Sequence, residues 1–352
     1  MSASGTLPIL DRLGRALAAA PSAVLDQSGV TLLLDGVWRA RCAILDVYDR
    51  GISDNGARLK PDDSPVTDAD LAADRILRHV LASDLGLAAE RVISEEHPMD
   101  AAGIAGMADD EHVRFFVDPL DGTREFIKRS GQFVICIGAV RCGRPIFGLI
   151  HAPVTGASML AWKSEDGHRA RAAAFRMQRT ATSGPENGAW TLSELDWLDE
   201  RLPSRNPRSS LKLLVSGSSP DGAPGPSRLA DILRSGKVAL NVRVVPVGSA
   251  LKFCYIADGT ADVYLRRAPT SYWDTVAGQA IVECAGGSVW MFETAGAQPA
   301  VPMTYCRASL SNTAFAVFRA GLDSEVQAGI LESVGKALRD HSVPTPSPFS
   351  KV

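Results

Sequence analysis

The stretch that most constrains this chain is an apolar run that ends in two aspartates. Residues 114–117 are predicted to form a buried strand, and Pro119 follows at once, so we expect the strand to stop where Asp118 and Asp121 fall. Both carboxylates would then face one point, as the ligands of a metal ion do. Pro, Asp and Gly are also ordinary turn residues, so a turn without a function is the alternative.

The residues after this turn suit an anion. Gly122 permits close approach to the backbone, and residues 124–128 are predicted to form a short helix directly behind Thr123. The N–H groups of Gly122 and Thr123 would then point at an anion at the start of that helix. A metal ion and a phosphate would meet at this place.

Further acids stand at the ends of predicted elements. Thr67 is the expected N-cap of a long helix, which places Asp70 at the third helical position, where capping alone explains an acid. We expect the buried face of that helix to consist of apolar residues, namely Leu71, Ile76, Leu77, Val80 and Leu81.

Two more candidate ligands have equally plain alternatives. Glu95 and Glu96 follow a short predicted strand, where paired acids commonly face solvent, but a carboxylate beside Asp118 would suit a two-metal site. Asp274 would lie in the first turn of an apolar helix, where the helix dipole alone accounts for an acid. By the same logic Lys60, ahead of the long helix, is expected to be a solvated cation.

Composition excludes some classes of function. The net charge of -3 over 352 residues provides no general basic field for nucleic-acid binding. Charged residues interrupt the apolar stretch at residues 7–20, so we expect neither a signal peptide nor a membrane span. The cysteines lack a CxxC pair and favour buried free thiols in a reducing cytoplasm; they are Cys42, Cys136, Cys142, Cys254, Cys284 and Cys306.

The order of predicted elements divides the chain into successive parts. We expect a helix at residues 37–48, an antiparallel meander over 132–162, a helix at 192–202, and strands at 213–216, 242–247, 261–265 and 288–291. The predicted parts are an N-terminal extension (1–36), an N-terminal α+β half (37–162), a polar insertion or linker (163–212), a C-terminal α/β half (213–320), and a C-terminal helix and tail (321–352), in which a helix at about 324–340 precedes a disordered Pro-rich tail.

Three motifs together resemble the metal-binding signatures of the inositol monophosphatase superfamily, a group of lithium-sensitive, magnesium-dependent phosphatases. They are Ser-Glu-Glu (94–96), Asp-Pro-Leu-Asp-Gly-Thr (118–123) and Trp-Asp-Thr-Val-Ala-Gly (273–278), in the same order. The resemblance covers most of residues 38–318. It implies an α/β fold, an α-β-α-β-α sandwich with two mainly antiparallel sheets, the larger one in the N-terminal half, and an active site between the halves.

Within the superfamily, residues 123–133 resemble the 3'(2'),5'-bisphosphate nucleotidases of sulfur assimilation, as do the stretches 60–67, 248–254 and 269–270. Inositol monophosphatases usually have Asn-Phe and a nearby His after the shared Thr. One departure concerns the substrate, because Ser-Gly-Ser-Ser (216–219) stands where these nucleotidases usually have Ser-x-Ser-His. Phe115 replaces a common Trp and Arg124 a common Lys, and both changes are conservative.

The resemblance assigns roles residue by residue. Two or three Mg²⁺ ions would be held by Glu95, Asp118, the carbonyl group of Leu120, Asp121 and Asp274. Glu95, together with Thr123 held by Asp70, would orient or deprotonate a water that attacks the phosphoryl group in line. Substrate would contact Gly122, Thr123, Ser249, Lys252, Arg266 and Arg267, although solvated cations are the alternative for the basic residues.

The resemblance therefore implies removal of the 3'-phosphate of adenosine 3',5'-bisphosphate, and of the same group in its sulfonated form. One alternative is a phosphatase for inositol or another sugar phosphate, which the missing His keeps open. A catalytically silent nucleotide or metal sensor is the other alternative. A small phosphorylated nucleotide is the expected partner, and the resemblance allows a homodimer that no stretch of this sequence specifies.

Overall fold

The computed structural model describes most of residues 9–340. The segments outside the description within that range are 20–23, 52–55, 62–63, 99–110, 165–169, 180–189, 198–209, 217–232, 234–240, 294–298 and 307–308. Ser219, where the nucleotidase-like motif lacks its His, and the predicted Pro-rich tail beyond Asp340 thus lie outside the described residues.

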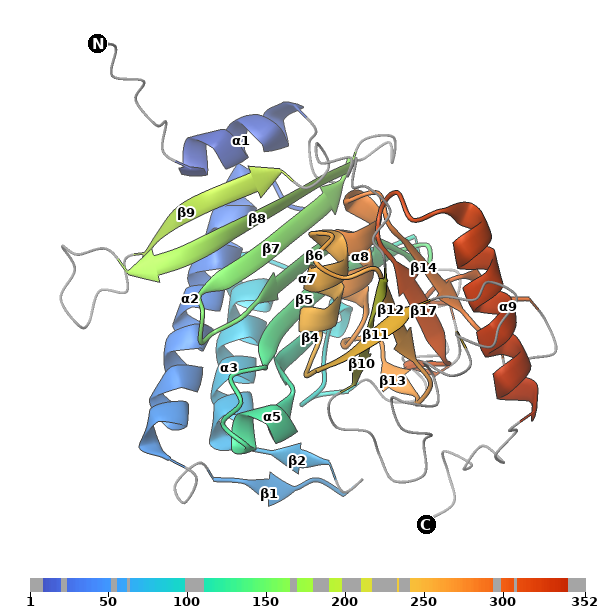
Figure 1. Cartoon of the computed structure of the whole chain (residues 1–352). Coiled ribbons are helices and arrows are strands. Elements are labelled where there is room, and N and C mark those ends of the chain that lie inside the picture. Colours follow the sequence, from blue (N-terminus) through green and yellow to red (C-terminus); the bar gives the residue numbers. More distant parts are fainter. Residues whose placement is uncertain are drawn as a thin grey trace, which may run out of the picture.

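Helices and sheets alternate in five layers (Figure 1). Helices α2 (Gln27–Arg50) and α3 (Asp68–His79) pack on one face of a seven-stranded sheet, and α7 (Leu251–Ala257) and α8 (Val276–Cys284) pack between that sheet and a six-stranded one. Helix α9 (Ser324–Asp340) covers the outer face of the second sheet. This order confirms the predicted α-β-α-β-α sandwich.

The larger sheet has the strand order β3-β4-β5-β6-β7-β8-β9, in which only β3 and β4 run parallel. Its strands are β3 (Val92–Ser94), β4 (Arg114–Asp121), β5 (Val134–Arg141), β6 (Arg144–His151), β7 (Ala157–Lys163), β8 (Ala170–Arg179) and β9 (Trp190–Trp197). The prediction of a helix at residues 192–202 is therefore wrong for residues 192–197, which belong to β9 and pair with β8, and its remainder lies outside the described residues.

The smaller sheet has the order β11-β10-β12-β17-β14-β15. Strand β10 runs parallel to both of its neighbours, while the other three pairings are antiparallel, so this sheet is mixed. Its strands are β10 (Leu211–Ser216), β11 (Val242–Val247), β12 (Val263–Arg266), β14 (Ser288–Met291), β15 (Val301–Pro302) and β17 (Phe315–Phe318). Two short ribbons complete the strands, β1 (Arg58–Leu59) with β2 (Pro65–Val66) and β13 (Thr270–Ser271) with β16 (Ser311–Asn312).

The remaining helical segments are short or terminal. They are α1 (Ile9–Ala19), a π-helical turn (Val80–Asp84), a 3-10 turn (Ala89–Arg91) and α5 (Thr123–Ile127). Helix α2 begins well before the predicted residue 37, because the Asp26 side chain caps it by accepting the Gly29 N–H at 2.7 Å. The predicted boundary between the extension and the first half thus falls inside a helix.

The buried face of α3 differs from the prediction. Thr67 is the N-cap and forms a capping box with Asp70, as expected. Leu71 and Ile76, however, are only partly buried, whereas Asp70 and Asp74 are almost fully buried on the stripe that continues to Leu77. A helix that buries two acids must give each of them partners.

A pair of glycines lets α8 approach the larger sheet closely. Gly138 on β5 and Gly148 on β6 are register partners beneath the first turn of α8. A Cβ atom at Gly148 would lie 2.3 Å from the carbonyl oxygen of Ala277, and one at Gly138 would lie 2.6 Å from the Ala277 nitrogen. Only glycine fits these two positions, so the start of α8 rests on the sheet backbone.

Two smaller predictions have mixed outcomes. Cys136, Cys254 and Cys284 are buried free thiols as predicted, while the three other cysteines are exposed. None of the helices that the structure describes is both long and apolar enough to cross a membrane. The cytoplasmic location and the homodimer stay predictions.

Candidate metal and phosphate site

An irregularity in β4 brings Asp118 and Asp121 together. The prediction that Pro119 ends the strand is wrong, since β4 continues to Asp121. Asp118 pairs with Cys136 and Asp121 with Val134, so three steps along β4 lie opposite two steps along β5. Residues three apart in a regular strand point to opposite faces, and the extra residue of the bulge returns Asp121 to the face of Asp118.

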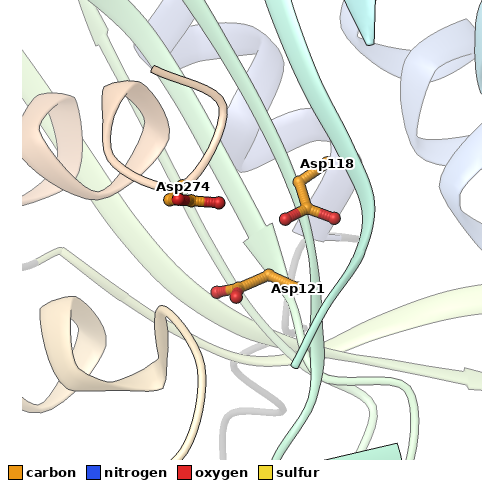
Figure 2. Close-up of side chains that lie close together, drawn as sticks. All are labelled: Asp118, Asp121 and Asp274. Atoms are coloured by element: carbon orange, nitrogen blue, oxygen red, sulfur yellow. The ribbon is translucent and has the colours of Figure 1, made fainter. Parts of the chain in front are cut away.

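Asp274 completes a group of three carboxylates. One oxygen from each of Asp118, Asp121 and Asp274 lies within 4.8 Å of the others, and Figure 2 shows the three side chains converging from β4 and from the loop before α8. Each carboxylate accepts a backbone N–H: Leu120 donates to Asp118 at 2.9 Å, Ala250 to Asp121, and Ser271 to Asp274 at 2.7 Å. Backbone donors thus hold all three in place.

This carboxylate trio is electrostatically unfavourable without cations. Burial, followed by the charges of Glu95 and Asp121, raises the pKa of Asp118 well above its usual value. Burial also raises the pKa of Asp121 to about 6, against the opposing effect of Lys252, and that of Asp274 to about 8. Close carboxylates that disfavour their own ionisation need positive charge, and an all-oxygen donor set fits a hard cation such as Mg²⁺.

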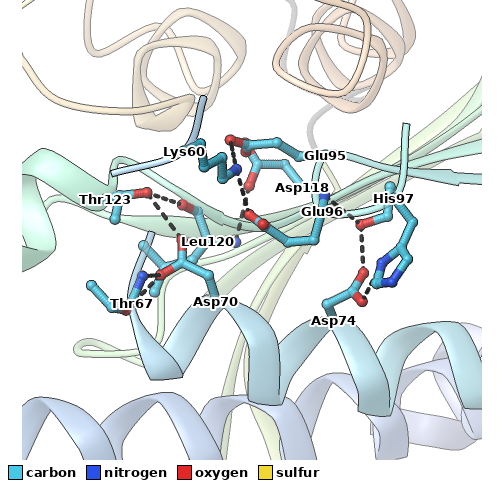
Figure 3. Close-up of polar contacts among 11 residues, drawn as sticks. Lys60, Thr67, Asp70, Asp74, Glu95, Glu96, His97, Asp118, Leu120 and Thr123 are labelled. Carbon is cyan, nitrogen blue, oxygen red and sulfur yellow. Dashed lines mark hydrogen bonds and ion pairs between the residues drawn. The ribbon is translucent and has the colours of Figure 1, made fainter. Parts of the chain in front are cut away.

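Glu95 stands next to the trio without belonging to it. Its N–H donates to the Val117 carbonyl group at 3.0 Å, which continues the β3–β4 pairing, and its carboxylate lies 2.8 Å from Nζ of Lys60. Lys60 also lies 2.7 Å from the carboxylate of Glu96, whose side chain is 5% exposed (Figure 3). The expectations that Lys60 is merely solvated and that paired glutamates face solvent are therefore wrong.

Asp70 both caps α3 and contacts Thr123. Its Oδ2 accepts the Thr67 N–H at 2.8 Å and the Thr67 hydroxyl at 2.5 Å, and its Oδ1 accepts the Thr123 hydroxyl at 3.0 Å (Figure 3). Burial raises the pKa of Asp70 to about 7, although the Thr67 hydrogen bonds oppose this and the Glu95 charge adds to it. The capping explanation is thus correct but incomplete.

The loop before α7 packs against Gly122. Gly122 has a φ of 101°, and a Cβ atom there would lie 3.1 Å from the Gln132 carbonyl oxygen and 3.2 Å from Cβ of Ser249. Only glycine suits both this conformation and this contact. Ser249 itself has a φ of 52°, so the backbone on both sides of the contact takes an uncommon shape.

Two cations lie near the acids. Lys252 is 4% exposed; its ammonium group donates to the carbonyl oxygens of Val247, at 3.1 Å, and of Ser249, and lies 5.1 Å from the centre of the Tyr264 ring. Burial lowers the pKa of Lys252 to about 8, while the charge of Asp121 opposes that shift. Arg266 donates to the Ser216 hydroxyl and to the Ala268 carbonyl oxygen at 3.2 Å.

One pocket of about 340 Å³ collects most of the predicted site residues. It is lined by Glu95, Asp118, Leu120, Asp121, Gly122, Thr123, Ser249, Lys252, Arg266 and Asp274. Asp70 lies behind Thr123, and Arg267 is not among the lining residues. The lining also includes Ser216 and Tyr264, which sequence reasoning did not assign to the site, and only the change from Ser-x-Ser-His had drawn attention to Ser216.

Comparison with known proteins agrees with this geometry. The model of the inositol monophosphatase family matches residues 35–320. The chain belongs to this family. The 3'(2'),5'-bisphosphate nucleotidase CysQ of Salmonella typhimurium is 34% identical to it over 263 residues, which make up 72% of this chain and 87% of the relative. CysQ of Escherichia coli K12 is 33% identical over 257 residues, or 70% and 84% of the two chains.

Solved structures of inositol monophosphatase family members share the fold. CysQ from Bacteroides thetaiotaomicron aligns with a TM-score of 0.60 at 29% identity, over 84% of this chain and 98% of that one. Inositol monophosphatase II from Staphylococcus aureus aligns with a TM-score of 0.54 at 17% identity, over 86% and 93%. The predicted family and fold class are thus confirmed, and the chain is a phosphatase of the inositol monophosphatase family.

Proposed function

We propose that this chain is a magnesium-dependent phosphomonoesterase that removes the 3'-phosphate of adenosine 3',5'-bisphosphate and of its sulfonated form. The observation that carries the proposal is one pocket that is lined both by the carboxylate trio and by the cations Lys252 and Arg266. A second phosphate requires cations of its own, beyond those that the reacting phosphate meets. The identity of about a third with CysQ nucleotidases supports the same substrate.

The metal ligands in this proposal are those expected from the sequence. Two or three Mg²⁺ ions would be held by Glu95, Asp118, the Leu120 carbonyl group, Asp121 and Asp274. When bound, Mg²⁺ neutralises charge on the phosphoryl group and lowers the pKa of a coordinated water.

Thr123 and Asp70 would handle the proton of the attacking water. The Thr123 hydroxyl donates its hydrogen to Oδ1 of Asp70, so its oxygen is free to accept a hydrogen bond from water. As water loses a proton to Oγ1 of Thr123, the Thr123 proton moves to Oδ1 of Asp70. A pKa of about 7 suits Asp70 to accept a proton near neutral pH. Glu95, held by Lys60, would orient the same water.

The phosphate contacts in the proposal come from both halves of the chain. Gly122 and Thr123 both line the pocket, and their N–H groups would donate to the phosphoryl oxygens. Ser249, Lys252 and Arg266 would meet the second phosphate and the nucleoside. A substrate contact by Arg267 stays a prediction, since this side chain does not line the pocket.

Phosphate release tests the proposal directly. Adenosine 3',5'-bisphosphate and inositol 1-phosphate are assayed in parallel with and without Mg²⁺, with Asp118→Asn as the blank. We expect Mg²⁺-dependent release with a preference for the nucleotide and none from the variant. Preference for the inositol phosphate would overturn the substrate but keep the metal site, and turnover by Asp118→Asn would overturn the metal site. Nucleotide binding without release would instead indicate a sensor.

A further inference from the structure

Helix α3 buries a second acid that the proposed reaction does not use. Asp74 lies one helical turn after Asp70 on the same face of α3, and it is 1% exposed. Its Oδ1 accepts the hydroxyl of Ser94 at 2.6 Å, and its Oδ2 lies 2.9 Å from Nδ1 of His97 and 3.7 Å from the Arg78 guanidinium group. Figure 3 shows the Asp74 carboxylate pointing from α3 toward His97.

Ser94 and His97 are the two ends of a tight turn. The His97 N–H donates to the Ser94 carbonyl oxygen at 3.1 Å, and the Glu96 N–H lies 3.3 Å from the Ser94 hydroxyl oxygen. Glu95 and Glu96 are the two central residues of this turn. Asp74 therefore binds the side chains at both ends of the turn that presents Glu95.

The rest of the turn is held from other directions. The Glu95 N–H is paired with Val117, directly before Asp118 in β4, and Lys60 bridges the carboxylates of Glu95 and Glu96. The main chain at Glu95 is thus fixed between β4 and Asp74. Without Asp74, the Ser94 hydroxyl and the His97 ring would lose their common acceptor, and the turn would gain freedom where Glu95 approaches the carboxylate trio.

We propose that Asp74 is a positioning residue that holds the turn of residues 94–97 so that Glu95 meets the metal ions. Asp74 itself touches neither metal nor substrate in this proposal, which rests on the proposed function of Glu95 as a ligand. Groups that orient metal ligands in this way typically contribute about 10- to 100-fold to metal affinity or activity. Helix α3 then supports the site at two points: Asp70 accepts the Thr123 hydroxyl, and Asp74 accepts the Ser94 hydroxyl at the start of the turn that carries Glu95.

Mn²⁺ binding, measured by electron paramagnetic resonance at a temperature where every variant is folded, tests the proposal apart from activity. The variant Asp74→Asn keeps the shape of the side chain but cannot accept from both partners at once. We expect its Mn²⁺ dissociation constant to rise about 10-fold or more. The matched control is Asp262→Asn, which removes the charge from another buried ion pair, that with Arg319 at 2.6 Å, outside the pocket. This control should melt earlier without a change in Mn²⁺ affinity.

A double-mutant cycle distinguishes positioning from a purely structural role. If Asp74 acts through Glu95, adding Asp74→Asn to Glu95→Gln causes little further loss of Mn²⁺ affinity or of kcat. Additive losses would overturn the proposal. If Asp74→Asn does not fold, His97→Ala tests the same contact, because this side chain is 52% exposed and its removal leaves no cavity. Unchanged Mn²⁺ affinity and turnover in His97→Ala would also overturn it.

The metal-site assignment has its own control. Loss of Mn²⁺ binding in Asp118→Asn, together with wild-type binding in Asp74→Asn, would overturn the role of Asp74 and leave the proposed function standing. Wild-type binding in Asp118→Asn would overturn the proposed metal site, and the role of Asp74 with it.

Discussion

Replacing Asp274 by Asn should stabilise the metal-free protein while weakening its response to Mg²⁺. In the unfolded chain an Asp releases its proton near pH 4, whereas burial and the charges of Asp121 and Glu95 raise the pKa of Asp274 in the fold to about 8. The folded form therefore binds more protons than the unfolded form between these values, so the stability of metal-free protein falls as the pH rises from about 4 to about 8. Asn has no charge and escapes this loss, and it can still accept the N–H of Ser271.

The size of the effect follows from the shift in pKa. For a pKa of about 8 in the fold, the penalty on wild type is about 4 kcal/mol at pH 7 and about 2 kcal/mol at pH 5. These are upper limits, because Asp274 is only half-buried and water screens part of its charge. For a chain of 352 residues, 4 kcal/mol corresponds to a Tm difference of about 5 °C.

Thermal melting with EDTA at pH 5, 7 and 8 measures the prediction. Asp274→Asn should melt above wild type at pH 7 and 8, with a smaller difference at pH 5, and added Mg²⁺ should raise the Tm of wild type more than that of the variant. The control Asp262→Asn removes the negative charge that pairs with the buried Arg319 and should lower the Tm at every pH. The reasoning is refuted if metal-free Asp274→Asn melts at or below wild type at pH 8, or if the difference does not depend on pH.

Three further changes test other parts of the site. Gly148→Ala places a methyl group against Ala277, so we expect a loss of about 1–3 kcal/mol in urea unfolding together with weaker Mn²⁺ binding. In the control Gly335→Ala, inside α9, the new methyl group makes only ordinary contacts at 3.7 Å or more, so this variant should lower neither stability nor Mn²⁺ affinity. Thr123→Val removes the hydroxyl that Asp70 holds and should lower kcat about 100-fold with little change in Tm, while Thr123→Ser should restore most of the rate. Lys252→Met should raise KM for adenosine 3',5'-bisphosphate about 10-fold or more but raise KM for inositol 1-phosphate less, and equal increases would contradict its role in nucleotide recognition.

Features that depend on neighbours in the sequence could be predicted. Thr67 and Asp70 form the capping box that their spacing indicates, because both partners lie within one helical turn. The motif at residues 118–123 likewise places both of its aspartates in the pocket, although the strand does not end at Pro119. The proximity of β4 to the start of α8 could be predicted only from the family resemblance, because no local sequence pattern links segments so far apart.

Features that depend on pairing between distant strands could not be predicted. Pro119 looked like the end of a strand, yet β5 accommodates it in a bulge that no property of β4 alone reveals. The same problem affects β9, where Leu192 and Leu195 are spaced as in a helix. In the structure Ser193 pairs with Arg176 and Asp196 with Ala174, so the pairing of β9 with β8 is irregular here and three steps along β9 lie opposite two steps along β8.

Buried charges were the other source of error. Asp74 and Lys60 resemble surface residues in any pattern of apolar spacing, because hydrophobic periodicity assigns acids and lysines to the solvent side. Their burial follows from ion pairs and hydrogen bonds formed after the chain has folded, with His97 and Ser94 for Asp74 and with two glutamates for Lys60. Asp74 lies on the same helical stripe as Asp70 and Leu77, and this spacing is a local signal that could have predicted the burial of Asp74.

The close packing of α8 on Gly138 and Gly148 has a consequence for the order of events in folding. Asp274 reaches Asp118 only after the start of α8 has docked on Gly138 and Gly148, which joins segments distant in the sequence and is therefore among the slower steps. The packing of α8 on the sheet offsets the entropy that is lost when the chain between β4 and α8 is closed into a loop. The ion therefore binds to carboxylates that already lie close together. A divalent cation would then bind and stabilise only those molecules that have completed this docking, and it would not speed the docking itself.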